Sequence, residues 1–207
     1  MRLPNKRRKL SEEIIEKNYQ QLFAGFDKVY SLTNETKQYI LEHSVVIRYR
    51  AKEVILEYGE TCNYMLFCTH GLVSSNFIME AEEKIVWFMG AGDPVVAVDS
   101  WYDRQASDEK LVALQESTFV ALKQDQFDYL LESHQDFFKM AYRFTELQLQ
   151  LIVKRTKWQQ YSTEGKISNL EMLYPHLLQF LPNTALASYL GITRKTLSRI
   201  RNKRHHS

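Results

Sequence analysis

The feature that most constrains this chain is its C-terminal stretch TALASYLGITRKTLSRIRNKR, residues 184–204. Gly191 interrupts a helical pattern where the chain must turn sharply, and glycine reaches a positive φ without steric cost. Thr193 is a good N-cap for a new helix, because its hydroxyl can accept a free backbone N–H. Leu197 and Ile200, three residues apart, give that helix one apolar face. The stretch therefore predicts a helix-turn-helix.

The face of the second helix that points away from Leu197 and Ile200 is polar and basic. Arg, Lys, Asn and Ser can bond to base edges, and the major groove of DNA accepts a helix of this width. We therefore predict that this helix binds double-stranded DNA. The alternative is a solvated basic helix at the end of the chain. The predicted DNA-binding residues are Thr193, Arg194, Lys195, Thr196, Ser198, Arg199, Arg201, Asn202 and Lys203.

Charge is unevenly distributed along the chain, although 27 Lys and Arg nearly balance 25 Asp and Glu. The first ten residues are basic without an acidic residue, and no acidic residue follows Glu171. A cationic end on an anionic body suits a protein that presents one part to a polyanion. The basic run KRRK at 6–9 is either a second phosphate contact or a solvated tail.

Targeting signals are absent from the sequence: there is no signal peptide and no apolar run long enough to span a membrane. Cys62 and Cys68 lie in an apolar, strand-like run, and we interpret them as free thiols in a reducing compartment. We therefore expect a cytoplasmic protein without a membrane segment, a metal or another cofactor.

The middle of the chain, from Val45 to Lys123, breaks into eight short segments rich in β-branched and aromatic residues. Eight short strands separated by turns, with no helix between them, are typical of an antiparallel barrel or jelly roll. Helices are predicted on either side, beginning near Ser11, near Thr33 and at Gln124.

Residues 135–160 contain neither Pro nor Gly and predict one long helix. Apolar residues alternate along it at spacings of four and three, which is the heptad pattern of a coiled-coil seam. Such a seam packs either on the barrel or on a second copy, and the length of the helix favours a homodimer. The predicted dimer interface is Met140, Phe144, Leu147, Leu151 and Trp158.

These elements predict an α+β protein with three parts. Residues 1–133 hold the N-terminal helices and the antiparallel barrel. Residues 134–161 form the dimerisation helix, and residues 162–207 form the helix-turn-helix domain.

This order of parts resembles the Crp/Fnr family of bacterial transcription regulators from about Leu32 onward. The run 49–71, YRAKEVILEYGETCNYMLFCTHG, is similar to the family's strand–turn–Gly-Glu–strand–Gly signature, and GITRKTLSRIR is similar to its turn and recognition helix. The resemblance implies a cyclic nucleotide-binding-like barrel and RNA polymerase as a further partner. It also implies that Arg194, Lys195 and Arg199 contact DNA bases. Thr193 and Thr196 would contact the DNA backbone.

The resemblance is weakest at the segment that binds phosphate in cyclic nucleotide-binding members. Those members carry Gly-Glu and then Arg-Ser or Arg-Thr, whereas here the arginine position is Ser107, followed by Asp108 and Glu109. A phosphate diester needs a fixed guanidinium, and acidic neighbours repel it. We therefore expect the barrel not to bind cyclic AMP, and its effector stays unidentified. Arg104 lies nearby in an expected loop, and four bulky residues could fill the pocket: Trp87, Phe88, Trp101 and Tyr102.

The sequence thus predicts a transcription regulator, not an enzyme, that binds a palindromic operator as a homodimer. We expect no β-hairpin wing, because the sequence ends too soon after the recognition helix. A cupin-like enzyme would need converging metal ligands, and the barrel region offers only His70 after His43. A sensing module for a cyclic nucleotide or another small ligand, without specific DNA binding, is the other alternative.

Overall fold

The computed structural model describes residues 1, 10–173, 181 and 183–205, and the side chains of all of these except 173 and 201–205. Two helices precede the strands, α1 (Glu12–Asp27) and α2 (Asn34–His43). Both begin where the sequence predicts a cap: the Ile14 N–H donates to Ser11 Oγ at 3.4 Å, and the Thr36 N–H donates to Thr33 Oγ1 at 3.3 Å.

Residues 44–123 form a jelly roll of two antiparallel four-stranded sheets, in the orders β1-β8-β3-β6 and β2-β7-β4-β5. This confirms the predicted antiparallel barrel. Its core lies between the sheets and is built from inward residues of both, including Leu66, Phe119, Leu56 and Leu111. The strands are β1 (Ser44–Tyr49), β2 (Val54–Leu56), β3 (Tyr64–His70), β4 (Leu72–Met79), β5 (Glu82–Gly90), β6 (Pro94–Val95), β7 (Glu109–Ala113) and β8 (Ser117–Lys123).

A helix interrupts the strands, so the expectation of none was wrong. The run that predicts a sixth strand pairs only at Pro94–Val95 and then turns into α3 (Val98–Asp103). This helix places Trp101 in the barrel core, and Ser100 Oγ accepts the Cys62 N–H at 2.9 Å. A helix is favoured here because it buries Trp101 and lets Ser100 bond to Cys62, just before β3. The segment is too short for its sequence to show a helical period.

Gly71 is required by a close approach of two chain segments. Its φ is +107°, and a Cβ built there would lie 2.6 Å from the Cα of Ser117. No other residue fits the β3–β4 turn against the start of β8 without moving backbone.

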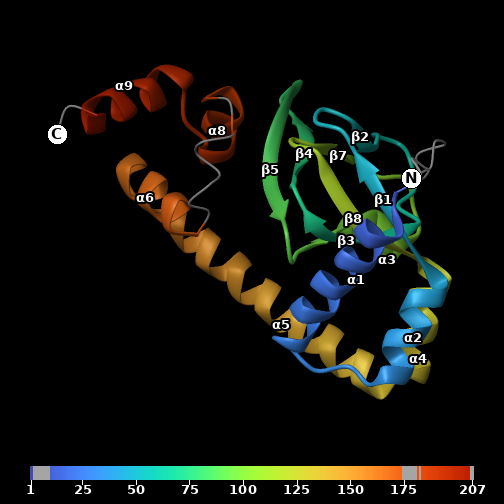
Figure 1. Cartoon of the computed structure of the whole chain (residues 1–207). Helices are drawn as coiled ribbons and strands as arrows, with labels where there is room; N and C mark the ends of the chain where they lie inside the picture. Colours follow the sequence, from blue (N-terminus) through green and yellow to red (C-terminus); the bar gives the residue numbers. More distant parts are fainter. Residues whose placement is uncertain (2–9, 174–180, 182, 206–207) are drawn as a thin grey trace.

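After the barrel come α4 (Gln124–Ser133) and the long helix α5 (Gln135–Trp158). Figure 1 shows α5 running from the end of the barrel near α2 and α4 to a group of helices at the C-terminus. This C-terminal unit consists of α6 (Thr163–Leu173), α8 (Asn183–Leu190) and α9 (Arg194–His205). Its core includes Ile167, Leu170, Leu186, Leu197 and Ile200, packed together with Leu72 and Phe88 of the barrel.

None of the helices in the described part of the chain is both long enough and apolar enough to cross a membrane.

Candidate nucleic-acid interface

The turn between α8 and α9 is fixed by Gly191. Its φ is +64°, and the Ile192 N–H donates to the Ala187 carbonyl at 3.0 Å while the Gly191 N–H donates to Ser188 O at 3.1 Å. These two bonds close the end of α8 as a Schellman-type cap, in which a left-handed residue is cheapest as glycine. The chain therefore passes from α8 to α9 through only three residues.

Thr193 caps the start of α9, as the sequence predicts. Its Oγ1 accepts the Thr196 N–H at 3.1 Å, and its carbonyl accepts the Leu197 N–H at the same distance. The hydroxyls of Thr193 and Thr196 are 2.9 Å apart and bond to each other. Both threonines, which the resemblance assigns to backbone contacts, thus also hold the first turn of the helix.

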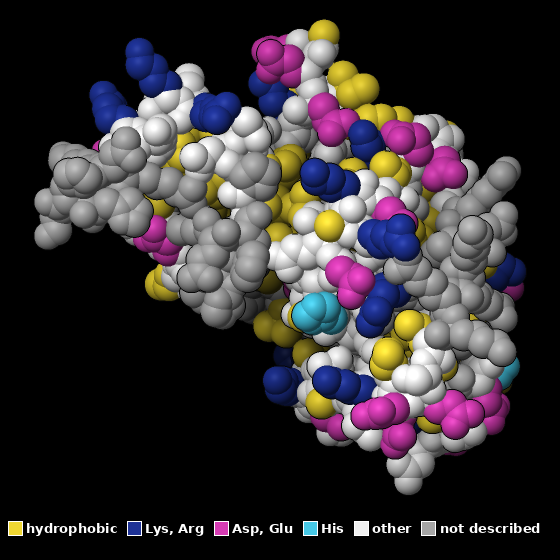
Figure 2. All heavy atoms as spheres, turned by 45° about the horizontal axis from the view of Figure 1, so that its top comes forward, with side chains coloured by type: hydrophobic (Ala, Val, Ile, Leu, Met, Phe, Trp, Pro, Cys, Tyr) yellow, Lys and Arg dark blue, Asp and Glu magenta, His cyan; other side chains and the backbone are white. Residues whose placement is uncertain are grey.

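One face of α9 is buried and the opposite face is cationic. Leu197 is 0% exposed and Ile200 is 5% exposed, so the predicted inward pair packs in the core of the C-terminal unit. Arg194, Lys195 and Arg199 are exposed. Figure 2 shows Lys and Arg side chains standing out at the upper left, where α9 lies. Thr196 and Ser198 are half-buried, and the side chains of Arg201, Asn202 and Lys203 lie outside the described ones.

Part of the seam predicted for dimerisation packs on the chain's own barrel. Met140 is 2% exposed and packs in a core with α1, α4 and β8, so it is not available to a partner. Phe144 packs on the same core, and Leu151 lies beside the β5–β6 turn. Leu151 and Trp158 are half-buried, and only Leu147 of the five is exposed. Met140 and Phe144 thus pack within the chain, and the dimer interface itself stays a prediction.

A different apolar stripe of α5 is open to solvent. Phe138, Tyr142, Leu149 and Ile152 are each 50–60% exposed. At 3.6 residues per turn they lie on the side roughly opposite Met140 and Leu151. The stripe lines a groove of about 570 Å³ between α5 and α3, whose other wall includes Val98 and Tyr102. This second seam is not predicted above, although its residues also follow heptad spacing.

The start of β7 holds a buried carboxyl group close to the position where the family resemblance implies a phosphate-binding arginine. Ser107 is buried, and its Oγ accepts the Glu109 N–H at 3.0 Å. Glu109 is buried as well, and this burial raises its pKa to about 7. A hydrogen bond with Ser75 opposes the shift, whereas the negative charge of Asp108 adds to it. Such a group disfavours a bound phosphate.

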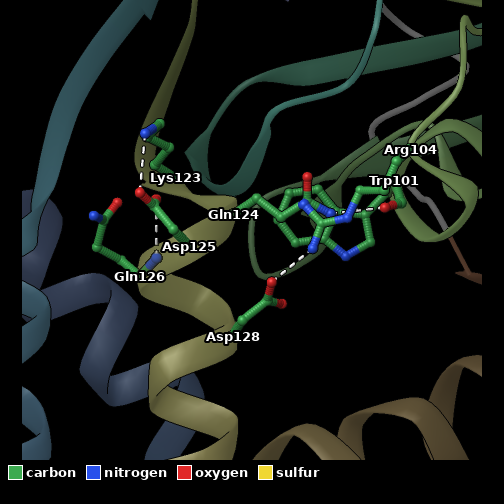
Figure 3. A network of polar contacts seen from close by, with 7 residues as sticks. All are labelled: Trp101, Arg104, Lys123, Gln124, Asp125, Gln126 and Asp128. Carbon is green, nitrogen blue, oxygen red and sulfur yellow. Dashed lines mark hydrogen bonds and ion pairs between the residues drawn. The ribbon is translucent and has the colours of Figure 1, made fainter.

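The guanidinium of Arg104 is directed away from such a role. Arg104 ends α3 with a φ of +59°, and its Nη2 is 2.6 Å from Asp128 Oδ2 of α4. Figure 3 shows this ion pair beside the bond from Gln124 Nε2 to the Trp101 carbonyl, 2.7 Å long. Together the two contacts tie α3 to the start of α4.

Of the four bulky residues that could fill the pocket, Trp101 packs in the barrel core and Trp87 packs against it, partly buried. Phe88 packs on the C-terminal unit, Trp87 contacts α5, and Tyr102 is exposed. Phe88 and Tyr102 therefore do not fill the barrel interior. Phe88 meets the C-terminal unit because it lies on the edge strand β5, where its ring contacts Tyr189 of α8.

Side chains typical of metal sites do not cluster in the described part of the chain: it contains no group of three His, Cys, Asp or Glu that could hold an ion. His70 is exposed, and the ring of His43 stacks on Tyr39 at 3.9 Å. Cys62 and Cys68 are buried free thiols, as expected.

Comparisons with known proteins agree with this architecture. Residues 46–134 match the sequence profile of the cyclic nucleotide-binding domain. FixK2 from Bradyrhizobium japonicum has a similar structure, with a TM-score of 0.65 and 15% identity over 79% of this chain and 85% of that one. The c-di-GMP-responsive global regulator CLP of Xanthomonas campestris has a TM-score of 0.61 and 15% identity, over 84% of this chain and 92% of that one.

The Catabolite Activator Protein of Thermus thermophilus gives a TM-score of 0.51 and 18% identity, over 88% of this chain and 85% of that one. No curated protein sequence matches this chain. These solved structures are regulators of the Crp/Fnr type. The resemblance expected from the sequence is thus confirmed at the level of the domain and the fold.

Proposed function

We propose that this chain, which carries a cyclic nucleotide-binding domain at residues 46–134 and the fold of Crp/Fnr-type regulators, is a transcription regulator that binds a palindromic DNA operator as a homodimer. It is a binding protein and not an enzyme. Its partners are double-stranded DNA, a second copy and, by the resemblance, RNA polymerase. As such a regulator it works in the cytoplasm.

The observation that carries the proposal is the two-faced helix α9. Leu197 and Ile200 anchor it in the C-terminal unit, and the cap at Thr193 fixes where it begins. Arg194, Lys195 and Arg199 then project from the exposed side. Long cationic side chains on an anchored helix can reach base edges and phosphates of a major groove together.

The proposal is tested by selecting duplexes from a random-sequence DNA pool with the whole chain. A dimer must set two recognition helices in successive major grooves on one side of the duplex. We expect the enriched sequence to be two-fold symmetric, with half-site centres about 34 Å apart. If no sequence is enriched and binding depends on salt alone, the proposed regulator function is wrong. The protein would then be a non-specific DNA binder or a sensing module without specific DNA binding.

The homodimer is supported by the exposed stripe of α5 and the groove beside it. Both are apolar and continuous, since Phe138, Tyr142, Leu149 and Ile152 belong to both. Patches of this kind on soluble proteins mark interaction sites. A second copy brings the same stripe, so two α5 helices can pack on each other about a two-fold axis. The interface proposed here replaces Met140, Phe144, Leu151 and Trp158 by this stripe.

We also propose that the barrel does not bind cyclic AMP or cyclic GMP tightly. Ser107 offers no positive charge, Glu109 is a buried acid, and the guanidinium of Arg104 is paired with Asp128. A phosphate without a guanidinium lacks charge-assisted hydrogen bonds of about 1.5–3 kcal/mol each. Calorimetry with either nucleotide should show no binding at micromolar concentration. A micromolar or tighter dissociation constant would contradict this, and Arg104→Ala would then be the first variant to examine.

A further inference from the structure

The C-terminal unit is attached to the barrel by a contact away from the exposed face of α9. Arg155, near the end of α5, lies between two aromatic rings. The carbon of its guanidinium is 4.5 Å from the ring centre of Trp87 on β5 and 4.6 Å from that of Tyr189 on α8. One side chain thus joins the barrel, the long helix and the C-terminal unit. We call these three residues the aromatic clamp.

Two neighbouring contacts fix α8 at the same place on β5. The N–H of Ile85 donates to Ser188 Oγ at 3.1 Å, and the ring of Tyr189 lies 4.5 Å from that of Phe88. Because β5 is an edge strand, some of its N–H groups have no partner strand, and α8 covers that edge. Figure 1 shows α8 beside β5. The clamp is therefore part of a specific docking contact.

The docked position leaves the cationic side chains of α9 free while it fixes the direction of the helix. Leu186 of α8 and Leu197 of α9 are both fully buried in one core, so the two helices move together. Arg194, Lys195 and Arg199 stay exposed. In a homodimer that pairs through α5, the aromatic clamp then sets the position of each α9 relative to the dimer axis.

We propose that Arg155 is a positioning residue, through which the barrel and α5 hold the two α9 helices at a fixed separation that matches two half-sites. This inference rests on the function proposed above. Two linked modules gain affinity over one only when their geometry lets both engage at once. A loose C-terminal unit must be ordered at the moment of binding, which lowers affinity for the pair of half-sites.

The docking contact is tested first without DNA, by amide exchange of the Ile85 N–H. Arg155→Ala should speed exchange at Ile85, whereas the amide of Val120 in the centre of the other sheet should keep its wild-type rate, which shows that the barrel is still folded. Lys157→Ala removes an exposed positive charge from the same helix and should leave both amides unchanged. Unchanged exchange at Ile85 in Arg155→Ala would overturn the clamp.

The positioning role is tested by binding of the whole chain to the duplex that it selects from a random pool, and to the same duplex with one half-site scrambled. Arg155→Ala should weaken binding to the two-half-site duplex about tenfold or more, because linkage of two sites contributes on this scale. Binding to the one-half-site duplex should change less than twofold. Arg155→Lys keeps the charge but not the flat stacking group, and we expect an intermediate loss.

If Arg155→Ala loses the same affinity for both duplexes, Arg155 contacts DNA directly. If Arg155→Ala gains affinity for the two-half-site duplex, the clamp holds the protein in a form that binds DNA poorly. Either result overturns the positioning role. If no duplex is selected by the wild type, the proposed function fails, and the exchange result at Ile85 still decides whether the clamp holds α8.

Discussion

At the scale of single residues, Ser107 and Glu109 carry the proposal that the barrel does not bind cyclic nucleotides tightly. The sequence alone shows that position 107 lacks a guanidinium, because the residue there is Ser107. It does not predict that the acid at 109 is buried or that Arg104 pairs with Asp128. Those facts depend on which side of β7 faces inward and on where α3 ends. Both follow from tertiary packing.

Glu109 gives a testable pH dependence of stability. Its folded-state pKa of about 7 lies above the ordinary value of 4.5. The folded protein therefore holds this proton more tightly than the unfolded chain does. The stabilisation is fully present below pH 4.5 and is lost as the pH rises through 7.

From pH 5 to pH 8, the free energy of unfolding of the wild type should fall by about 2–3 kcal/mol relative to Glu109→Gln, since one pKa unit corresponds to about 1.4 kcal/mol. Urea unfolding at the two pH values measures this difference. Glu132→Gln, at an exposed position on α4, serves as the control and should follow the wild type. Parallel pH profiles of wild type and Glu109→Gln would contradict the buried acid.

At the scale of elements, α5 shows what a periodic pattern can and cannot predict. The helix and its start at Gln135 follow from the sequence, because a run without Pro or Gly and with heptad spacing has few alternatives. The same spacing fits two seams, one at Met140 and Leu151 and one at Phe138 and Leu149. Periodicity alone does not distinguish the seam that packs on the barrel from the seam that stays exposed.

The exposed seam predicts a matched pair of variants. Leu149 and Leu147 are both exposed leucines of α5, 60% and 45% respectively, but only Leu149 lies on the proposed dimer stripe. Leu149→Glu should give monomers, because a charge in the centre of an apolar interface has no partner there. Leu147→Glu should stay dimeric. Sedimentation at micromolar concentration distinguishes them.

A monomeric wild type would overturn the dimer itself. A dimeric Leu149→Glu beside a monomeric Leu147→Glu would restore the seam that the sequence first suggested.

The turn from α8 to α9 is the element that the sequence predicts best. Gly191, Thr193, Leu197 and Ile200 each have the local role that their residue type implies. Such roles depend on neighbours three to five residues away in the chain, so local chemistry is sufficient. α3 is the opposite case: its six residues are helical because Trp101 packs into the barrel, and no local pattern indicates that.

At the scale of the whole molecule, the sequence predicts the order of barrel, long helix and C-terminal helices but not how they contact one another. The aromatic clamp joins residues 87, 155 and 189, which nothing in the sequence relates. Its members are also unremarkable by type, since one arginine and two aromatic residues occur in many helices and strands. Contacts between elements far apart in the sequence can therefore be identified only from the structure.

We propose that α9 reads DNA sequence with its exposed face. The most direct measurement is a binding titration of wild type, Arg199→Ala and Lys203→Ala on the selected duplex and on a scrambled one, at several salt concentrations. Arg199→Ala should cost about 1–3 kcal/mol on the selected duplex and much less on the scrambled one. Lys203→Ala should weaken both nearly equally and lower the salt slope by about one per subunit. If Arg199→Ala lowers both affinities by the same factor, Arg199 binds phosphate only and the face assigned to base recognition is wrong.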